Sequence, residues 1–139
     1  MKISTRGRYG LRALVDLAKN ESGPVPLREI STRQKISEQY LEQLFVNLRK
    51  SGIVKSVRGA YGGYLLKRLP EEITVNEIIT ALEGPIAPAD CVLHGESCEG
   101  ENDCVTHDLW LRIKEELDKL LDSITLANLI EKEQKKYDY

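Results

Sequence analysis

Residues 37–67, SEQYLEQLFVNLRKSGIVKSVRGAYGGYLLK, decide the fold of this 139-residue chain. Ser37 is a favourable N-cap, and apolar residues recur after it at the three- and four-residue spacing of one helix face. That face consists of Leu41, Leu44, Phe45 and Leu48. Gly52 predicts the end of this helix. The β-branched residues that follow, with the glycine-rich turn at 58–63, predict a β-hairpin.

Helices are predicted on both sides of this stretch. The first, residues 4–20, has an apolar face made of Leu11, Leu14, Val15 and Ala18. Pro26 opens a short second helix that runs to Gln34. Thr74 and Glu77 form a capping box at the start of a helix that ends at Gly84. Two helices joined by a tight turn and followed by a hairpin predict a winged helix-turn-helix unit.

A long helix is predicted from about Thr106. Its apolar stripe consists of Leu109, Ile113, Leu117, Leu120, Leu121 and Ile124, with Trp110 beside it. One small winged helix cannot bury this whole stripe, so the helix is expected to pack against a second copy of the chain. Thr125 is expected to cap a last helix, and residues 132–139 are expected to form a polar tail.

These elements predict a mainly α fold with a small β-hairpin. We divide the chain into a winged helix-turn-helix DNA-binding domain at 1–84, a ligand-binding loop at 85–105, and a dimerisation helix with a C-terminal helix at 106–139. No apolar run approaches the roughly 18 residues needed to cross a bilayer, and the N-terminal MKISTRGRYG has no signal-peptide core. We therefore expect a cytoplasmic protein with no membrane partner.

Charge is distributed unevenly between the two halves of the chain. Residues 1–68 carry 14 Lys and Arg against 5 Asp and Glu, whereas residues 69–139 carry 6 against 17. A basic half-domain is typical of a protein that meets a polyanion, and DNA is the usual one. No Ser/His/Asp set, phosphate loop or carboxylate pair stands out, so an enzyme is not expected.

The predicted DNA contacts follow from the expected exposed surfaces. Amide, hydroxyl and carboxylate groups early in the third helix can bond to base edges, and a wing arginine can enter a narrow minor groove. The residues predicted to read bases are Ser37, Gln39, Tyr40, Glu42, Gln43 and, on the wing, Arg58. The residues predicted to bind phosphates are Lys2, Arg6, Arg8, Arg49 and Lys50. A polar helix face is also typical of any solvated helix, so a winged helix that binds protein rather than DNA remains open.

A short acidic segment, residues 91–107, contains all three cysteines and both histidines of the chain: Cys91, His94, Cys98, Cys104 and His107. Three thiols and an imidazole form a four-donor set for a metal site. A disulfide framework is disfavoured by the odd number of cysteines, and an incidental cluster of exposed thiols by the usual burial of free cysteine. A structural zinc site and a metal-free thiol sensor remain open.

Five stretches of the sequence carry a family resemblance. They are STRGRYGLRAL at 4–14, residues 36–66, TALEGPI at 80–86, CVTHDLW at 104–110 and ITLANL at 124–129. On these the chain resembles the bacterial winged-helix repressors of the iron-sulfur cluster regulator (IscR) family. The resemblance implies a homodimeric repressor of cluster-biogenesis genes that binds a double-stranded DNA operator, and it adds cluster-assembly proteins as potential partners.

The same resemblance implies the ligands of a 2Fe-2S cluster. They would be Cys91, Cys98, Cys104 and His107. His94 is a rival for the fourth position, but His107 is held by the start of a helix, so placing it costs less conformational order than placing a histidine in a loop.

Overall fold

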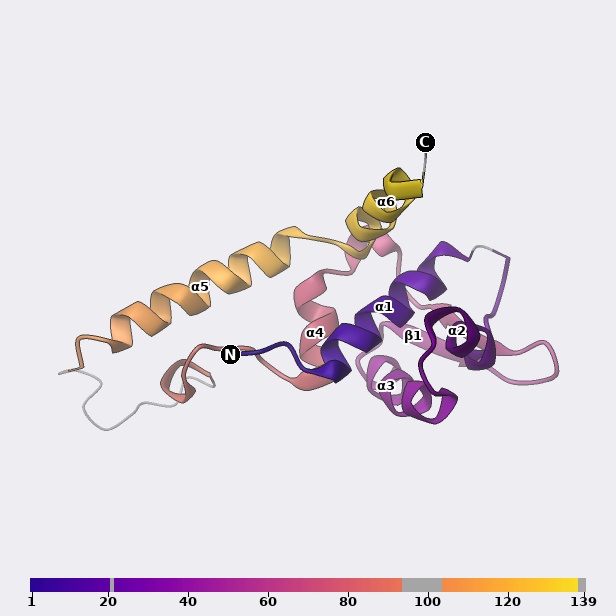
Figure 1. The fold of residues 1–139 in the computed structure, drawn as a ribbon, viewed down its shortest axis with the longest axis horizontal. Helices are drawn as coiled ribbons and strands as arrows, with labels where there is room; N and C mark the ends of the chain where they lie inside the picture. Colours follow the sequence, from indigo (N-terminus) through magenta and orange to yellow (C-terminus); the bar gives the residue numbers. More distant parts are fainter. Residues whose placement is uncertain (21, 94–103, 138–139) are drawn as a thin grey trace.

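The computed structural model describes residues 1–20, 22–93 and 104–137. Within them the chain is mainly helical, with one antiparallel β-hairpin, as predicted (Figure 1). The elements are α1 (Thr5–Lys19), α2 (Leu27–Gln34), α3 (Glu38–Lys50), β1 (Val54–Val57), β2 (Gly63–Leu66), the 3-10 turn η1 (Pro70–Glu72), α4 (Val75–Glu83), the 3-10 turn η2 (Asp90–Val92), α5 (His107–Ser123) and α6 (Leu126–Tyr137).

Helix α1 is the centre of the body and packs against α2, α3, α4, α6 and β2. Ser4 caps it, as its side chain accepts the N–H of Gly7. The buried face differs from the predicted stripe, because Leu11, Val15 and Ala18 are only partly buried. Its buried members are Gly7, Gly10, Ala13, Leu14, Asp16 and Leu17. The difference arises because the glycines let α4 approach closely, and a Cβ at Gly10 would overlap the side chain of Leu82.

Helices α2 and α3 form the predicted helix-turn-helix. Pro26 is the N-cap of α2, and Lys35 ends α2 in the left-handed conformation with φ of 57°. The side chain of Ser37 caps α3 by accepting the N–H of Tyr40. The predicted apolar face is confirmed in full, since Leu41, Leu44, Phe45 and Leu48 are all buried. This burial orients α3 and leaves its opposite face to solvent.

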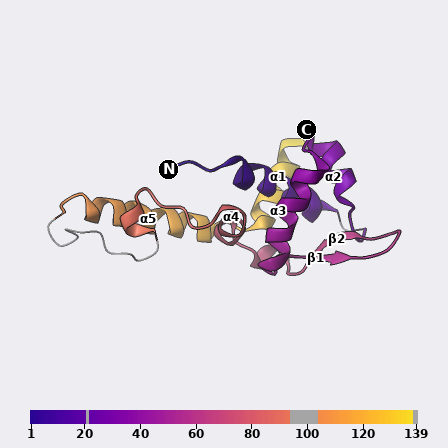
Figure 2. The same ribbon diagram turned by 90° about the horizontal axis from the view of Figure 1, so that it is seen from below.

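The wing is the hairpin of β1 and β2, which runs from the pair Val54 and Leu66 to the pair Val57 and Gly63. It projects from the body at the end opposite α5 (Figure 2). Val25, extended between two prolines, exchanges two backbone hydrogen bonds with Tyr64. Gly63 is required there, because its φ is +155° and a Cβ would overlap the backbone of Val25. Strand β2 is therefore attached to the body near its first residues, on the side of the wing's turn.

The C-terminal helix α6 returns to the body and packs on α1. It is joined to the start of α4 by backbone hydrogen bonds from Val75 to Ile124 and from Leu126 to Ile73. Residues 132–137 are not the predicted tail, because the helix continues to Tyr137; residues 138–139 lie outside the described residues. In this last part of α6, Glu133 forms an ion pair with Lys19 of α1, with Oε1 and Nζ 3.1 Å apart.

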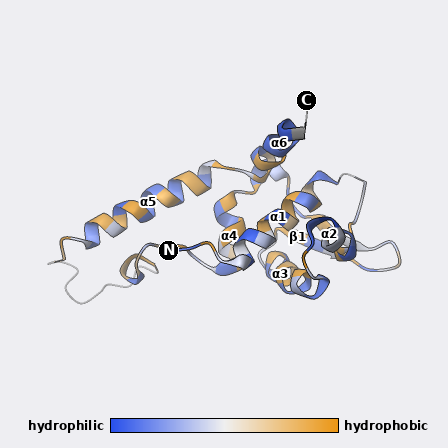
Figure 3. Ribbon diagram, viewed as in Figure 1, coloured by the Kyte–Doolittle hydropathy of each residue, from blue (hydrophilic) through white to orange (hydrophobic). Residues whose placement is uncertain are grey.

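Helix α5 extends away from the body as an arm, packed mainly against α4 and η2 (Figure 1). Its predicted start is confirmed, since Thr106 is the N-cap. Of its residues only His107 is buried, although apolar side chains recur along its length (Figure 3). Leu109 is 50% exposed and Leu120 56% exposed. The arm therefore presents apolar surface that this copy of the chain leaves uncovered.

Candidate DNA interface and metal-ligand segment

The exposed face of α3 presents the side chains that the sequence predicts to read bases. Ser37, Gln39, Glu42 and Gln43 are all exposed. Their orientation follows from the buried leucines and Phe45 on the other side of the helix. Amide oxygens and nitrogens can pair with adenine, and a carboxylate can accept a hydrogen bond from cytosine. Arg49 and Lys50, at the end of α3, are exposed as well.

Tyr40 lies differently from its neighbours on α3. Its side chain is partly buried, and its hydroxyl oxygen lies 3.3 Å from that of Thr5 at the start of α1. Its ring meets the ring of Tyr9 edge to face, with centroids 6.3 Å apart. Tyr40 therefore joins the first turn of α3 to the first turn of α1.

Arg58 is exposed at the turn of the wing, as the sequence predicts. The turn is closed by a hydrogen bond from the N–H of Gly62 to the carbonyl of Gly59, whose φ is +110°. The neighbouring Tyr61 is 95% exposed. The turn exposes a cationic side chain, which suits the minor groove of DNA.

Within the described residues, five cations form ion pairs, and the other lysines and arginines form none. Arg33, Arg68, Lys19, Lys114 and Lys135 form ion pairs within the protein. Within the described part of the chain, by contrast, the predicted phosphate-binding cations form no ion pair with a carboxylate. These are Lys2, Arg6, Arg8, Arg49 and Lys50, and Arg58 on the wing behaves in the same way. The unpaired cations are thus available to an external anion such as phosphate.

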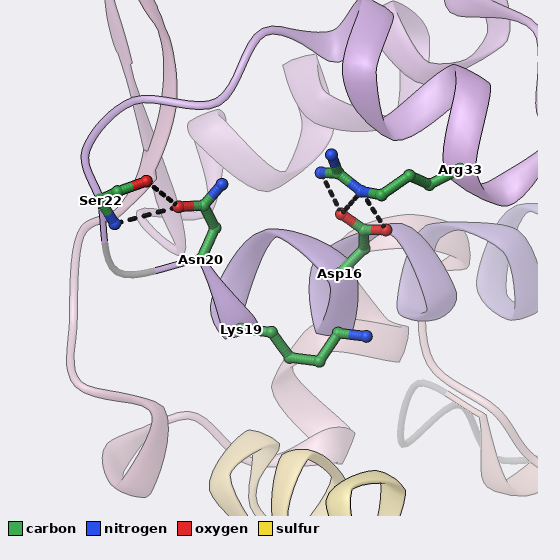
Figure 4. Close-up of a pocket in the computed structure, with 5 residues that line it drawn as sticks. All are labelled: Asp16, Lys19, Asn20, Ser22 and Arg33. Atoms are coloured by element: carbon green, nitrogen blue, oxygen red, sulfur yellow. Dashed lines mark hydrogen bonds and ion pairs between the residues drawn. The ribbon is translucent and has the colours of Figure 1, made fainter. Parts of the chain in front are cut away.

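Arg33 illustrates the paired group (Figure 4). Its guanidinium donates to both oxygens of Asp16, with Nη2 only 2.6 Å from Oδ1, and Gln34 donates to the same carboxylate at 2.8 Å. Asp16 is only 4% exposed. Burial raises the pKa of Asp16, but the hydrogen bonds from Arg33 and Gln34 outweigh it, so the pKa lies below its usual value. This network fastens α2 to α1.

The metal-ligand segment places two predicted ligands at the start of α5. His107 is the first residue of α5 and is 7% exposed, and its backbone N–H donates to the carbonyl of Cys104 at 3.2 Å. The Sγ of Cys104 lies 3.1 Å from the hydroxyl of Thr106. This hydrogen bond, with the backbone N–H groups of Thr106 and His107, lowers the pKa of the Cys104 thiol. A thiol with a lowered pKa is suited to bind a metal as thiolate.

Cys91 reaches the same region from another element. It lies in η2, which packs against α5. Cys98 and His94 lie outside the described residues. Among residues 1–20, 22–93 and 104–137, no three His, Cys, Asp or Glu side chains gather as a metal site. The described donors, two thiols and an imidazole, fit an iron-sulfur cluster or zinc in their chemistry.

Three residues that position the start of α1 and the first turn of α3 were not predicted from the sequence. Thr5 and Tyr9 hold Tyr40, and Glu83 accepts the backbone N–H of Ser4. All three fall within the stretches STRGRYGLRAL and TALEGPI, which were the only signal for them. Separately, no helix of the described chain is long and apolar enough to span a membrane.

Comparisons with known proteins identify the family. The model of the Rrf2 family, described as an iron-dependent transcriptional regulator, matches residues 3–132. The IscR regulator of Klebsiella pneumoniae (strain 342) is 45% identical over 135 residues, which cover 96% of this chain and 82% of that protein. The CymR regulator of Bacillus subtilis (strain 168) is 47% identical over 130 residues, which cover 93% and 89%.

A solved structure of T. potens IscR superposes with a TM-score of 0.81 at 42% identity, covering 100% of this chain and 93% of that one. The predicted winged-helix fold and the resemblance to IscR are thereby confirmed. The relatives named here are transcriptional regulators, which also bears out the expectation that the chain is not an enzyme. The chain belongs to the Rrf2 family of transcriptional regulators.

Proposed function

We propose that this protein is a cytoplasmic, homodimeric repressor of iron-sulfur cluster biogenesis genes whose operator binding is modulated by a 2Fe-2S cluster. Its ligands are Cys91, Cys98, Cys104 and His107. The observation that carries the proposal is the position of the described donors. His107 begins the arm helix, Cys104 lies three residues before it, and Cys91 lies on the turn packed against that helix.

DNA binding is supported by the exposed face of α3 and by the wing. The amide and carboxylate side chains of α3 are directed away from the core and can enter a major groove, and Arg58 can enter the adjacent minor groove. The cations without carboxylate partners, Lys2 and Arg6 among them, supply phosphate contacts. In this arrangement Glu42 discriminates between operators. Its carboxylate repels phosphates, but it can accept a hydrogen bond from a suitably placed cytosine.

A dimer is supported by α5. Leu109, Leu111 and Leu120 stay exposed along it in this copy of the chain, and two-fold pairing with a second α5 would bury them. The pairing would also place two winged helices on one operator, as a two-fold symmetric DNA site requires. The ligand segment then lies at the start of the dimerisation helix, where the presence or absence of a cluster can affect both copies of the chain.

The residues of this chain have distinct parts in holding the cluster. His107 is fixed by the first turn of α5, and Cys104 is held beside it by the backbone hydrogen bond. A cluster, when bound, supplies a redox-active centre whose potential depends on its ligands. Cluster-assembly proteins are the partners expected to deliver it.

A second candidate function has support from the comparisons. CymR, the global cysteine regulator of B. subtilis, is as similar to this chain as IscR is. The alternative is therefore a regulator of cysteine metabolism that uses zinc or thiol chemistry in place of a cluster. The same four residues would then hold zinc, which binds three cysteines and a histidine in structural sites.

Anaerobic purification tests the two functions against each other. We expect a coloured protein with visible absorbance and with iron and acid-labile sulfide bound. Colourless protein with stoichiometric zinc, or with no metal, would favour the alternative. C91A, C98A and C104A are each expected to abolish cluster retention while leaving a folded dimer.

The two histidines provide a matched pair for the fourth ligand. H107A is expected to impair cluster retention more than H94A, measured as iron per protomer after identical reconstitution. The opposite order would assign the ligand to His94. Unfolding of the metal-free dimer, followed by circular dichroism, would instead indicate a structural zinc site, because such sites contribute folding energy.

A further inference from the structure

The carboxylate of Glu83 is bound to the beginning of α1. Both of its oxygens accept the backbone N–H of Ser4, at 3.1 and 3.2 Å. Ser4 is the N-cap of α1, and Glu83 is the last residue of α4. The two residues are 79 positions apart. The contact therefore joins the end of one helix to the start of another.

Gly7 makes room for this contact. A Cβ at Gly7 would overlap the Oε1 atom of Glu83, so a larger residue there would displace the carboxylate. Helix α1 also has no acidic residue in its first turn, although it carries Arg6 and Arg8 there. A carboxylate is favourable at a helix N-terminus, and here α4 supplies it.

The contact continues to the surface that is proposed to read DNA. Thr5, the residue after Ser4, lies 3.3 Å from the hydroxyl of Tyr40 in the first turn of α3. Tyr9, one turn further along α1, holds the ring of Tyr40. Two consecutive residues at the start of α1 thus contact different helices. Ser4 contacts α4, and Thr5 contacts α3.

On its other side, Glu83 leads directly to the ligand segment. Gly84 ends α4 with φ of +88°, and seven residues later Cys91 lies in η2, which packs on α5. Residues 85–89 are thus the direct chain connection between η2 and the end of α4. At this end of α4, the carboxylate of Glu83 accepts a hydrogen bond from the backbone N–H of Ser4, the N-cap of α1.

We propose that Glu83 is a positioning residue that sets the start of α1 against α3 on DNA and transmits the state of the ligand segment to it. Glu83 itself touches no ligand and no base. Its role is mechanical, through Ser4 and then through Thr5 and Tyr40. The second part rests on the proposed function, whereas the first concerns the protein with or without a cluster.

Four variants separate the contact from its charge. E83A removes the contact, and G7A displaces the carboxylate while leaving its charge in the protein. E83Q removes the charge but keeps an oxygen that accepts the Ser4 N–H. E77Q is the matched control, because Glu77 is on the same helix and bonds to Thr74 and Arg68, away from α1. Glutamine can replace glutamate in a capping box.

Two measurements apply to each variant. The first is hydrogen–deuterium exchange of the peptide covering residues 1–10 in the cluster-free protein. The second is the dissociation constant for a fluorescein-labelled duplex, selected by the wild-type holoprotein from a randomised library, measured with and without the cluster at fixed salt. The second yields a ratio of cluster-free to cluster-bound affinity.

We expect E83A and G7A to exchange faster than wild type at residues 1–10 and E77Q to match wild type. E83Q should lie between wild type and E83A, because it keeps one oxygen that accepts the Ser4 N–H but loses the charge. We also expect the ratio of cluster-free to cluster-bound affinity to be closer to one in E83A and G7A than in wild type, by a factor of about five or more. Such a factor is the usual lower range of coupling between two sites. Thermal melts establish that the compared proteins are folded. G7A and E83Q keep the comparison valid if E83A does not fold.

Wild-type exchange and a wild-type ratio in both E83A and G7A would overturn the inference and leave the proposed function intact. Equal effects of E83Q and E83A, with E77Q unchanged, would also overturn it, because charge and not the contact would then be responsible. A wild-type ratio of one would overturn the cluster-dependent function and the transmission with it. The exchange data and the cluster-free affinities would still decide whether Glu83 positions α1.

Discussion

The hydroxyl oxygens of Thr5 and Tyr40 lie 3.3 Å apart, so the first turn of α1 holds the first turn of α3. The pair gives Tyr40 two potential roles, one in packing and one at the DNA. T5V and Y40F each remove the same hydrogen bond, but only Y40F removes the hydroxyl from α3. The two variants therefore form a matched pair.

We expect T5V and Y40F to lower the free energy of unfolding by similar amounts, about 0.5–1 kcal/mol, because a typical net hydrogen bond contributes that much. Their double variant should lose no more than either alone. Y40F should weaken operator binding more than T5V, measured by fluorescence anisotropy, since the sequence predicts a DNA contact for Tyr40. Equal weakening would mean that the hydroxyl acts only through α1.

Arg58 and Lys50 are predicted to act on different features of DNA. R58A should weaken binding by about 1–3 kcal/mol on operators with a narrow minor groove, because a guanidinium gains most there. K50A should weaken binding to all sequences alike and reduce the salt slope by about one, as expected for the loss of one phosphate contact. The test measures the affinities of R58A and K50A for operators with narrow and with wide minor grooves over a series of salt concentrations. If the two variants behaved identically, Arg58 would be only another phosphate contact.

Glu42 is predicted to select operators. The cluster-free and cluster-bound proteins should rank the members of a randomised operator library differently. E42A should shrink that difference, because it removes the carboxylate that disfavours sites lacking a suitably placed cytosine. Binding of wild type and E42A, each with and without cluster, is measured at fixed salt. Identical rankings for the two wild-type forms would reduce the cluster to a uniform switch of affinity.

The Asp16 and Arg33 pair makes stability depend on pH. The pKa of Asp16 is lower in the folded protein, so its contribution is fully present above the unfolded value, about 3.9, and is lost as pH falls through the folded value. D16N should therefore cost about 1–3 kcal/mol at pH 7, and the difference from wild type should shrink near pH 3.

Urea unfolding at fixed protein concentration measures this difference, because dimer stability depends on concentration. E29Q is the control, since Glu29 meets the same arginine at 3.8 Å on the surface. Its cost should stay below about 0.5 kcal/mol at either pH. A D16N cost that does not change between pH 7 and pH 3 would contradict the assignment.

The arm helix is predicted to form the dimer. L120E places a charge on its apolar side, where Leu120 is 56% exposed. Burial of a leucine contributes about 1.5–3 kcal/mol, so its loss should raise the dimer dissociation constant by roughly ten- to a hundredfold. L69E is the control, because Leu69 is 62% exposed in the connection between the wing and α4. Sedimentation that shows unchanged dimers for L120E would reject the arm as the interface.

The sequence alone determined the features that depend on neighbours a few residues apart. Ser37 caps α3, Thr74 and Glu77 form the capping box of α4, and Gly52 follows the end of α3. These signals act through hydrogen bonds and side-chain spacing within one or two turns, so they are visible in the linear order of residues. The ligand segment was visible for the same reason, because its thiols and imidazoles are close in sequence.

Only the tertiary structure decided which distant residues meet. Glu83 reaches Ser4 across 79 positions, and Glu133, in the helical stretch 132–137, reaches Lys19 across 114. Glycines at 7 and 10, which look unfavourable in a helix, are explained by the close approach of α4. Such contacts depend on how whole helices pack, and packing is set by the shapes of both surfaces together, so no local pattern in the chain specifies it.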